Sequence, residues 1–204
     1  MVPDKVRQDN RSDILEPELL LAAYASGYFP MADSPHGNIR WYSPDPRAVI
    51  PLDGFTISRS LRQTIRKKIF DVKVDTAFED VIRGCAARHE TWISEEIVQS
   101  YLELHRRGFG HSVEVWRGMR LAGGLYGVAL GAAFFGESMF SRERDASKVA
   151  LVALVDRLRQ RHFELLDTQY TTPHLAGLGV VEIPKAEYLG LLDNALRKQP
   201  PFVD

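Results

Sequence analysis

The segment 121–169 constrains the fold of this chain more than any other part of the sequence. It has five parts in this order: the strand-like runs 121–130 and 132–141, the polar loop 142–145, the apolar helical run 146–161 and the strand-like run 163–170. A strand, a helix and a second strand in succession form a crossover unit, whose two strands normally lie parallel in one sheet. The sequence therefore predicts a parallel pair here, with a functional site where its strands end.

The remaining segments predict an α+β fold around this unit. Helical patterns occur at 17–26, 58–68, 77–87, 94–107, near 172–176 and at 184–197, and strand-like patterns at 70–75, 112–117 and 180–183. The strand 112–117 turns directly into the runs that open the crossover unit, so we expect three consecutive strands to form an antiparallel meander. Together these elements predict a mixed sheet with flanking helices.

The segment 28–47 carries repeated prolines, from Pro30 to Pro46, and this density predicts an ordered loop region without regular structure. A surface linker is one interpretation. The segment also holds four aromatic residues, and these favour a small N-terminal lobe that packs against the rest: Tyr28, Phe29, Trp41 and Tyr42. We therefore expect a small N-terminal domain, 1–52, joined to a larger domain, 53–204.

Composition excludes several classes of protein. With 45% hydrophobic residues in 204, the chain can bury a full core, and its net charge of −1 excludes a protein that is basic overall. The single cysteine, Cys85, excludes an internal disulfide and a multi-cysteine zinc site. No apolar run is long enough to span a membrane and the N-terminus is not signal-like, so we expect a cytoplasmic protein without membrane contact.

Sequence motifs for several chemistries are missing. There is no His-x-x-x-His pair, Walker loop, Gly-x-Ser-x-Gly or Gly-x-Gly-x-x-Gly, so a metal hydrolase, an NTPase and a serine hydrolase all lack support. The six histidines are dispersed without ligand spacing, and no metal site is expected. His174 lies between Pro173 and Leu175, where a histidine is more often a packing residue at a helix start than a catalytic base.

A helix over 58–68 would gather positive charge on one face. Arg59, Arg62 and Arg66 recur at helical spacing, Lys67 and Lys68 follow them, and no acidic residue interrupts the run. Uncompensated cations on one short helix attract a polyanion. The pattern alone leaves two interpretations open, a phosphate-binding surface and an ordinary solvated helix face.

The strand that ends the crossover unit carries a carboxylate and an amide. Asp167 and Gln169 are two residues apart, so both side chains point to one side of the strand, while Leu166 points to the other. Glu137 and Met139 share one face of the strand 132–141 in the same way. If the two strands are neighbours, two carboxylates and an amide converge on one pocket.

The order of meander, polar loop, helix and strand resembles the GNAT acetyltransferase fold. Enzymes of that fold have a glycine-rich loop before the helix, and this loop holds the pyrophosphate of coenzyme A. In this chain the corresponding segment is SRERDAS at 141–147, which has no glycine and two acidic residues. The resemblance therefore implies a GNAT-like fold, while the loop argues against a coenzyme A site.

A more specific resemblance rests on motifs spread along the chain. They are WYSPDPRAVIP (41–51), TWI (91–93), HSVEVW (111–116), GGLYGVALG (123–131), FFGESMFS (134–141), ASK (146–148), LLDTQ (165–169) and HLAGLG (174–179). In this order they resemble the leucyl/phenylalanyl-tRNA–protein transferase family, over roughly residues 18–192. The resemblance implies an enzyme that moves Leu or Phe from aminoacyl-tRNA to proteins beginning with Arg or Lys, which marks them for degradation. It implies no cofactor, and it leaves open whether Met is also a donor.

The resemblance also implies roles for individual residues. Asp167 and Gln169 are expected to form a relay, in which the carboxylate holds the amide and the amide accepts a hydrogen bond from the attacking amine. In a competing account the terminal hydroxyl of the tRNA assists the proton transfer, and the final proton acceptor stays open. Glu137 is either a structural anchor or the partner of the acceptor's cationic side chain. The candidates for a donor slot are Met139, Phe134, Leu154 and Leu166; those for stacking on the terminal adenosine are Trp41, Tyr42 and Trp92; those for tRNA binding are Arg59, Arg62, Arg66, Lys67 and Lys68. For each apolar or aromatic candidate, a place in the core is the simpler alternative.

Two other functions stay open on the sequence. One is an acyl-CoA-dependent N-acyltransferase of the same fold, which the glycine-free loop disfavours. The other is a non-catalytic RNA-binding module that uses residues 59–68, and it is disfavoured by the acid and amide that face one pocket.

Overall fold

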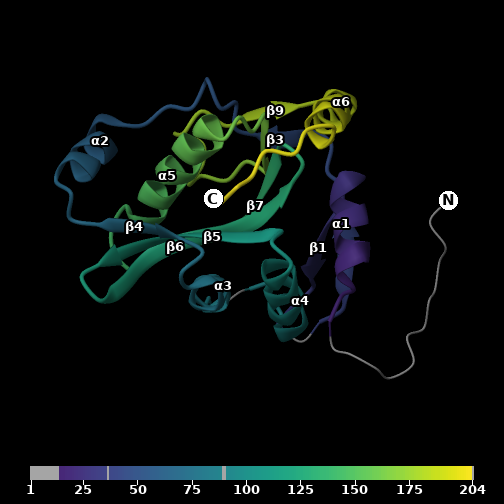
Figure 1. The fold of residues 1–204 in the computed structure, drawn as a ribbon, viewed down its shortest axis with the longest axis horizontal. Helices are drawn as coiled ribbons and strands as arrows, with labels where there is room; N and C mark the ends of the chain where they lie inside the picture. Colours follow the sequence, from purple (N-terminus) through teal and green to yellow (C-terminus); the bar gives the residue numbers. More distant parts are fainter. Residues whose placement is uncertain (1–13, 36, 89–90, 204) are drawn as a thin grey trace.

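A mixed β-sheet forms the centre of the protein in the computed structural model, which describes residues 14–35, 37–88 and 91–203. Within those residues the sheet has seven strands in the order β4-β5-β6-β7-β8-β3-β9. Their bounds are β3 Arg47–Val49, β4 Asp71–Val74, β5 Gly110–Arg117, β6 Arg120–Leu130, β7 Ala133–Ser141, β8 Leu165–Gln169 and β9 Val181–Ile183. Figure 1 shows the long strands β5, β6 and β7 crossing the middle of the molecule.

The crossover unit predicted from the sequence is confirmed. Strands β4 to β7 pair antiparallel in succession, α5 (Ala146–Gln160) follows β7, and β8 then pairs with β7 in parallel, with Phe135 opposite Asp167. The tight turn between β6 and β7 depends on Gly131, whose φ is +58° and whose Cβ, if present, would lie 2.7 Å from the carbonyl oxygen of Ala195. The predicted α+β, GNAT-like fold is therefore the fold of this chain.

Helices cover both faces of the sheet and separate two hydrophobic clusters. Helices α5 and α2 (Arg59–Arg66) pack on one face, and α3 (Phe78–Ala86) and α4 (Glu95–Arg106) pack on the other (Figure 1). Successive residues of a central strand enter different clusters, as Phe134 and Phe135 do, because side chains alternate across a strand. The central strands are therefore buried on both sides, and polar side chains among them need partners inside the protein.

The first and last helices of the described chain lie beside each other. Helix α1 (Pro17–Ala25) and helix α6 (Lys185–Leu196) contact each other, and Figure 1 shows them at the end of the molecule opposite α2. No helix in the described part of the chain is both long and apolar enough to cross a membrane.

The prediction of a loop over 28–47 was wrong. That segment contains β1 (Phe29–Ala32) and β2 (Ile39–Tyr42), which form an antiparallel pair, and then β3, which joins the main sheet between β8 and β9. Pro30 fits in β1 because this strand has a partner on one side, so a residue without an N–H breaks no ladder on the other. Since β3 lies inside the predicted domain 1–52, that segment takes part in the main sheet; the boundary at residue 52 stays a prediction.

The prediction of a short helix near 172–176 was also wrong. The N–H groups of Leu175 and Ala176 both bond to the carbonyl oxygen of Thr172 at 2.9 Å, which makes hydrogen-bonded turns and no further helical ladder. Glycines follow at once, and Gly179 has a φ of +86°. The chain therefore turns toward β9 after these bonds.

Candidate active site

A cavity of about 690 Å³ opens where the parallel strands β7 and β8 separate. The strands pair as far as Phe135 and Asp167, and beyond that point residues 136–142 and 168–170 line the cavity. Gln169 ends β8 with a φ of +60°, a left-handed conformation that turns the chain out of the strand. The ends of the two strands thus enclose the place where the crossover unit predicted a site.

Glu137 is buried in the wall of this cavity and accepts three hydrogen bonds. The Tyr24 hydroxyl donates to Oε1 at 2.7 Å, the Tyr101 hydroxyl to Oε2 at 3.2 Å, and Nε2 of Gln169 to Oε1 at 3.0 Å. Burial raises the pKa of Glu137 to about 7, against the tyrosine hydrogen bonds, which lower it, and with the negative charge of Asp167, which adds to the rise. Glu137 therefore changes its protonation state near neutral pH.

Asp167 is fully buried behind the cavity and forms an ion pair with Arg47. Nε and Nη2 of Arg47 donate to its two oxygens at 2.9 and 2.6 Å, and the Tyr188 hydroxyl donates to Oδ2 at 2.8 Å. Oδ1 also accepts the backbone N–H of Gln169 at 2.9 Å, which holds the left-handed turn. The predicted bond from the side-chain amide of Gln169 to Asp167 is not formed, because that amide donates to Glu137 instead. Asp167 is not among the described residues that line the cavity, and its bond to the N–H of Gln169 links it to the lining.

Arg47 completes this arrangement, although its role was not predicted from the sequence. Its guanidinium lies between the rings of Phe29 and Tyr188, with Cζ 4.9 and 4.5 Å from the ring centroids, and Nη1 donates to the carbonyl oxygen of Gly27 at 3.0 Å. Burial works against its charge, but the carboxylate of Asp167 outweighs burial and raises the pKa of Arg47. The signal in the sequence is a lone arginine at the start of the apolar run RAVI, since a buried arginine needs a partner.

The wall of the cavity is mainly apolar and includes part of the predicted donor slot. Met139, Leu154 and Leu166 line it, and so does Trp92, one of the three predicted adenosine-stacking residues. Phe134 does not line it, because this side chain is fully buried in the core and stacks on Phe202 with ring centroids 5.2 Å apart.

Two aromatic candidates lie outside the cavity. Trp41 and Tyr42 are partly buried on β2, and the ring of Tyr42 stacks on Phe29 at 6.1 Å. Phe29 and Met31 of the neighbouring β1 line the cavity themselves. These two residues were not predicted as part of the site, because the sequence pattern indicates no strand there.

Exposed residues of the lining mark the mouth of the cavity, and they include Arg88, Arg142 and His174. His174 Nε2 lies 3.1 Å from the hydroxyl of Ser147, which in turn accepts from the Ser141 hydroxyl at 2.8 Å. Burial lowers the pKa of His174, and the positive charges of Lys148 and Arg88 lower it further. His174 is thus a neutral, exposed imidazole in contact with Ser147, and the helix start predicted around it is absent. Within the described residues, no three His, Cys, Asp or Glu side chains come together as metal ligands would.

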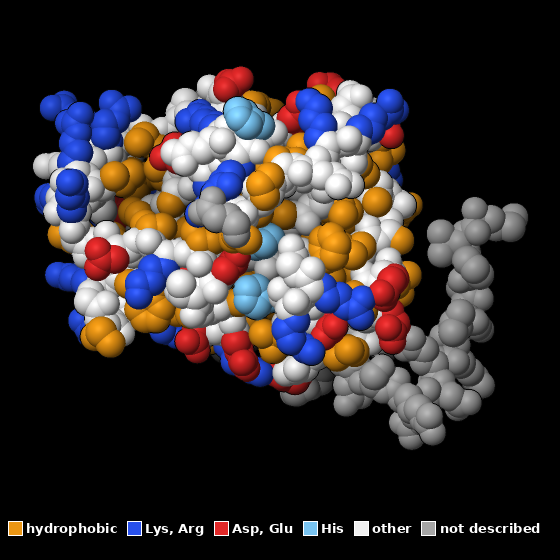
Figure 2. All heavy atoms as spheres, in the orientation of Figure 1, with side chains coloured by type: hydrophobic (Ala, Val, Ile, Leu, Met, Phe, Trp, Pro, Cys, Tyr) orange, Lys and Arg blue, Asp and Glu red, His pale blue; other side chains and the backbone are white. Residues whose placement is uncertain are grey.

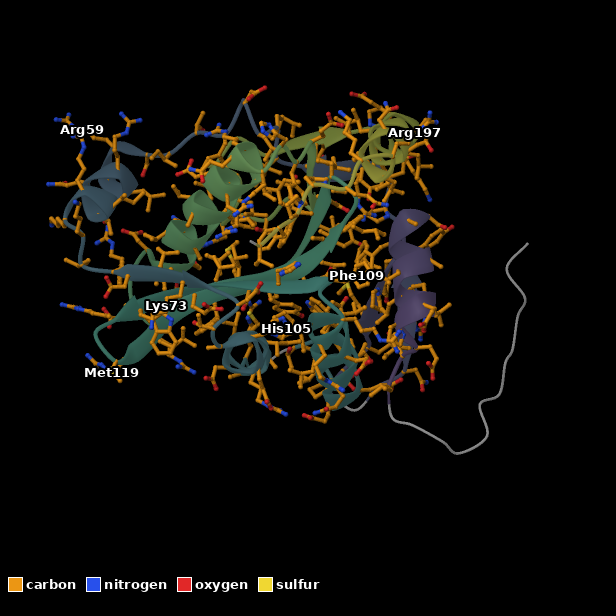
Figure 3. All side chains as sticks on the ribbon, viewed as in Figure 1. Arg59, Lys73, His105, Phe109, Met119 and Arg197 are labelled. Carbon is orange, nitrogen blue, oxygen red and sulfur yellow. The ribbon has the colours of Figure 1, made fainter. Side chains whose placement is uncertain are left out.

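Helix α2 presents its positive charge to solvent at one end of the molecule. All five predicted cations are exposed: Arg59, Arg62, Arg66, Lys67 and Lys68. Figure 2 shows Lys and Arg side chains gathered over this helix. In Figure 3 the side chain of Arg59 points away from the body, and Arg197 lies at the opposite end. None of these five residues lines the cavity, so the basic surface is separate from it.

Known proteins match this chain along most of its length. The family model described as leucyl/phenylalanyl-tRNA protein transferase matches residues 49–193, and the model for the N-terminal domain of that family matches residues 13–45. The leucyl/phenylalanyl-tRNA–protein transferase of Rubrobacter xylanophilus is 58% identical over 189 residues, which cover 92% of this chain and 98% of that protein. The transferase of Gloeobacter violaceus is 57% identical over 182 residues, covering 89% of this chain and 94% of that protein. A solved structure, the C-terminal domain of a putative lysylphosphatidylglycerol synthetase from Agrobacterium fabrum, is 14% identical with a TM-score of 0.43, covering 89% of this chain and 57% of that one.

Proposed function

The chain belongs to the leucyl/phenylalanyl-tRNA protein transferase family, and on that premise we propose that it moves Leu or Phe from aminoacyl-tRNA to the α-amine of proteins that begin with Arg or Lys. It is thus an aminoacyltransferase with a GNAT-like fold. The observation that carries this proposal is the cavity between β7 and β8, where the amide of Gln169 and the carboxylate of Glu137 meet an apolar wall.

The reaction is an ester aminolysis, which needs orientation more than activation. The amine nitrogen attacks the ester carbonyl carbon, the bond to the ribose oxygen breaks, and the proton lost by the amine ends on that oxygen. An α-amine has a pKa of about 8, so a useful fraction is neutral at physiological pH. The ester is already activated, and holding amine and ester in attack geometry supplies much of the acceleration.

Gln169 is the group that orients the amine. Its Nε2 is committed to Glu137, so the carbonyl oxygen of the amide is left to accept an N–H from the substrate. The residue is fixed from two sides, because Asp167 holds its backbone N–H while Glu137 holds its side chain. Asp167 is therefore a positioning residue, and Arg47 and Tyr188 keep it in place.

Glu137 is the carboxylate among the described cavity-lining residues, and it recognises the basic acceptor. A guanidinium or ammonium group brought into the cavity favours the ionised form of a carboxyl whose pKa is about 7. Binding of an N-terminal Arg or Lys and ionisation of Glu137 are thus coupled. An acceptor with a neutral N-terminal side chain gains no binding energy from this coupling. The enzyme therefore prefers acceptors that begin with Arg or Lys.

The donor is held by the apolar wall and by two nucleic-acid contacts. Met139, Leu154 and Leu166 receive the Leu or Phe side chain, and Trp92 stacks on the terminal adenine. Helix α2 binds phosphates of the acceptor stem, a contact that is independent of sequence and so admits several tRNAs. The stacking roles predicted for Trp41 and Tyr42 stay predictions.

The alternative of an acyl-CoA donor is disfavoured at the start of α5. The N–H of Ala146 bonds to the carbonyl oxygen of Glu143 at 3.2 Å, and the N–H of Ser147 bonds to Oγ of Ser141 at 2.8 Å. Backbone N–H groups that are already bonded within the protein are a poor cradle for a pyrophosphate.

A transfer assay with radiolabelled Leu-tRNA and a peptide that begins with Arg tests the proposal. Label is expected in this peptide, much less in the same peptide beginning with Ala, and none in an N-acetylated copy. Transfer from acetyl-CoA but not from Leu-tRNA would establish the alternative donor. Binding of tRNA without transfer from either would indicate a non-catalytic RNA-binding module.

The organisation and location of the enzyme follow the same proposal. Residues 1–52 and 53–204 act as its two domains, a division supported by the separate family models that end at residue 45 and begin at residue 49. The enzyme acts in the cytoplasm, where aminoacyl-tRNA is made.

A further inference from the structure

The 142–145 loop, which joins β7 to α5, has its two acidic side chains turned toward neighbouring elements. Oε2 of Glu143 accepts from Nη1 of Arg117 on β5 at 2.7 Å, and Oδ2 of Asp145 accepts from the hydroxyl of Thr64 on α2 at 3.1 Å. Arg144 is 89% exposed, and its Nε lies 3.9 Å from Oδ2 of Asp145. The loop therefore shows an exposed arginine to solvent, whose contact with Asp145 is long, while its carboxylates also bond to neighbouring elements.

Arg142, two residues before Arg144, places a second positive charge at the cavity itself. It lines the cavity, with its guanidinium carbon 5.2 Å from the centroid of the Phe140 ring and Nη1 3.3 Å from the carbonyl oxygen of Leu121. On the other side of the mouth Arg88 donates to the hydroxyl of Ser138 at 3.1 Å.

Cationic side chains lie around the mouth, because Arg88 and Arg142 line the cavity and Lys148 lies near His174. Lys148 and Arg88 both lower the pKa of His174, so their charges reach that point. Glu137, the carboxylate among the described lining residues, lies buried in the wall beside Gln169. A bound ligand that extends out of the cavity through this mouth thus passes arginine side chains rather than acidic ones.

We propose that Arg142 and Arg144 bind phosphodiester groups of the unpaired 3′ end of the donor tRNA. This inference rests on the proposed function, because the terminal ester must reach Gln169 while the preceding nucleotides leave through the mouth. Each of those nucleotides carries one negative charge, and arginine forks match phosphate geometry. The side chains of the loop thus hold phosphate where a glycine-rich loop would use its backbone.

The loop and α2 contact different parts of the same tRNA. Thr64 ties the loop to α2, so the single-stranded end can run from the cavity over Arg142 and Arg144 to a duplex lying on the helix. Binding of single strands falls with salt by a slope of about 0.7 per neutralised phosphate, and binding of a duplex by about 0.9. The contribution of the loop to affinity should therefore be measurable with a single-stranded probe that has no duplex.

The test compares two probes on the full chain. One is a tetranucleotide ending in CCA that carries phenylalanine through a 3′-amide bond, and the other is adenosine carrying phenylalanine in the same way, without a phosphodiester. Arg142→Gln with Arg144→Gln is expected to weaken binding of the tetranucleotide on the order of tenfold at low salt and to reduce its salt slope by about 1.4. Arg144→Gln alone, at an exposed position, should show about half of that slope change. The adenosine probe should bind the parent and both variants equally.

Arg197→Gln is the matched control, because Arg197 is exposed at the opposite end of the molecule (Figure 3). Equal binding of the tetranucleotide to parent and variants would overturn the inference. An equal loss for both probes would overturn it too, since it would mean that the loop shapes the cavity and does not bind phosphate. A failure of the parent to transfer Leu to an Arg peptide would instead refute the proposed function, and the tetranucleotide measurement would still decide the role of the loop.

Discussion

Replacing Glu137 with glutamine removes a buried carboxyl whose ionisation lowers the free energy of unfolding at neutral pH. The pKa of this carboxyl is about 7 in the folded protein, against an ordinary value of 4.5. A group whose pKa is raised by folding stabilises the folded state fully below its unfolded pKa and loses that contribution as the pH rises through its folded pKa. One pKa unit corresponds to about 1.4 kcal/mol, so the loss between pH 4.5 and 7 amounts to ~3 kcal/mol. Glutamine has the same shape, and a tyrosine hydroxyl can accept from its amide as well as donate.

Urea unfolding, followed from pH 5 to pH 8.5 in both proteins, measures this effect. We expect the free energy of unfolding of the parent to fall relative to Glu137→Gln by ~2–3 kcal/mol over that range. Taking the difference removes the titration of other groups, and Glu187→Gln on the exposed face of α6 controls for the loss of one carboxyl group. Parallel curves for parent and Glu137→Gln would mean that the carboxyl is ionised throughout, and the burial argument would be refuted.

Three further predictions concern the ion pair, the donor slot and the basic helix. Asp167→Asn should lower the free energy of unfolding by about 3–5 kcal/mol, because Arg47 stays buried without its counter-charge; a urea denaturation curve close to the parent's would contradict this. Met139→Phe should narrow the slot and reduce kcat/KM for Phe-tRNA relative to Leu-tRNA roughly tenfold to a hundredfold, which corresponds to ~1–3 kcal/mol of transition-state binding. An unchanged ratio of the two kcat/KM values would show that Met139 is not part of the slot. The double variant Arg62→Glu, Arg66→Glu should weaken tRNA binding and reduce the slope of log affinity against log salt concentration by about 1.8. Filter binding over a salt series measures both quantities, and unchanged affinity would mean that the helix is only a solvated face.

The sequence predicts the central fold well because its signal is local. The crossover unit can be recognised from alternation, a polar loop and a helical run that follow one another within 121–169, and the parallel pairing of β7 and β8 follows from chain connectivity. The segment 28–47 is different, because prolines argue against strands in general. Pro30 is tolerated since β1 has a partner on one side, and this depends on tertiary neighbours that no local pattern reveals.

The types of residue at the site can be predicted from the sequence, but their hydrogen-bond partners cannot. Alternation places Asp167 and Gln169 on one side of a strand, but it cannot show that Gln169 leaves the strand with a positive φ and turns its amide to Glu137. Nor can it show Arg47, whose contact with Asp167 joins residues 120 positions apart. Such a pairing has no sequence period, and it becomes visible only when β3 is placed beside β8.

The polar end of the cavity depends on the N-terminal segment folding onto the sheet. Tyr24 from α1 and Arg47 from β3 belong to the first 52 residues, and they contact Glu137 and Asp167 directly. Without that segment Asp167 would be buried with no counter-charge, and Glu137 would lose its shortest hydrogen bond. Because buried carboxylates without partners are costly, the larger domain alone would have to repack the wall that positions Gln169. The small N-terminal segment is therefore a structural part of the proposed site, and we expect a chain cut at residue 52 to lose the arrangement of Glu137, Asp167 and Gln169.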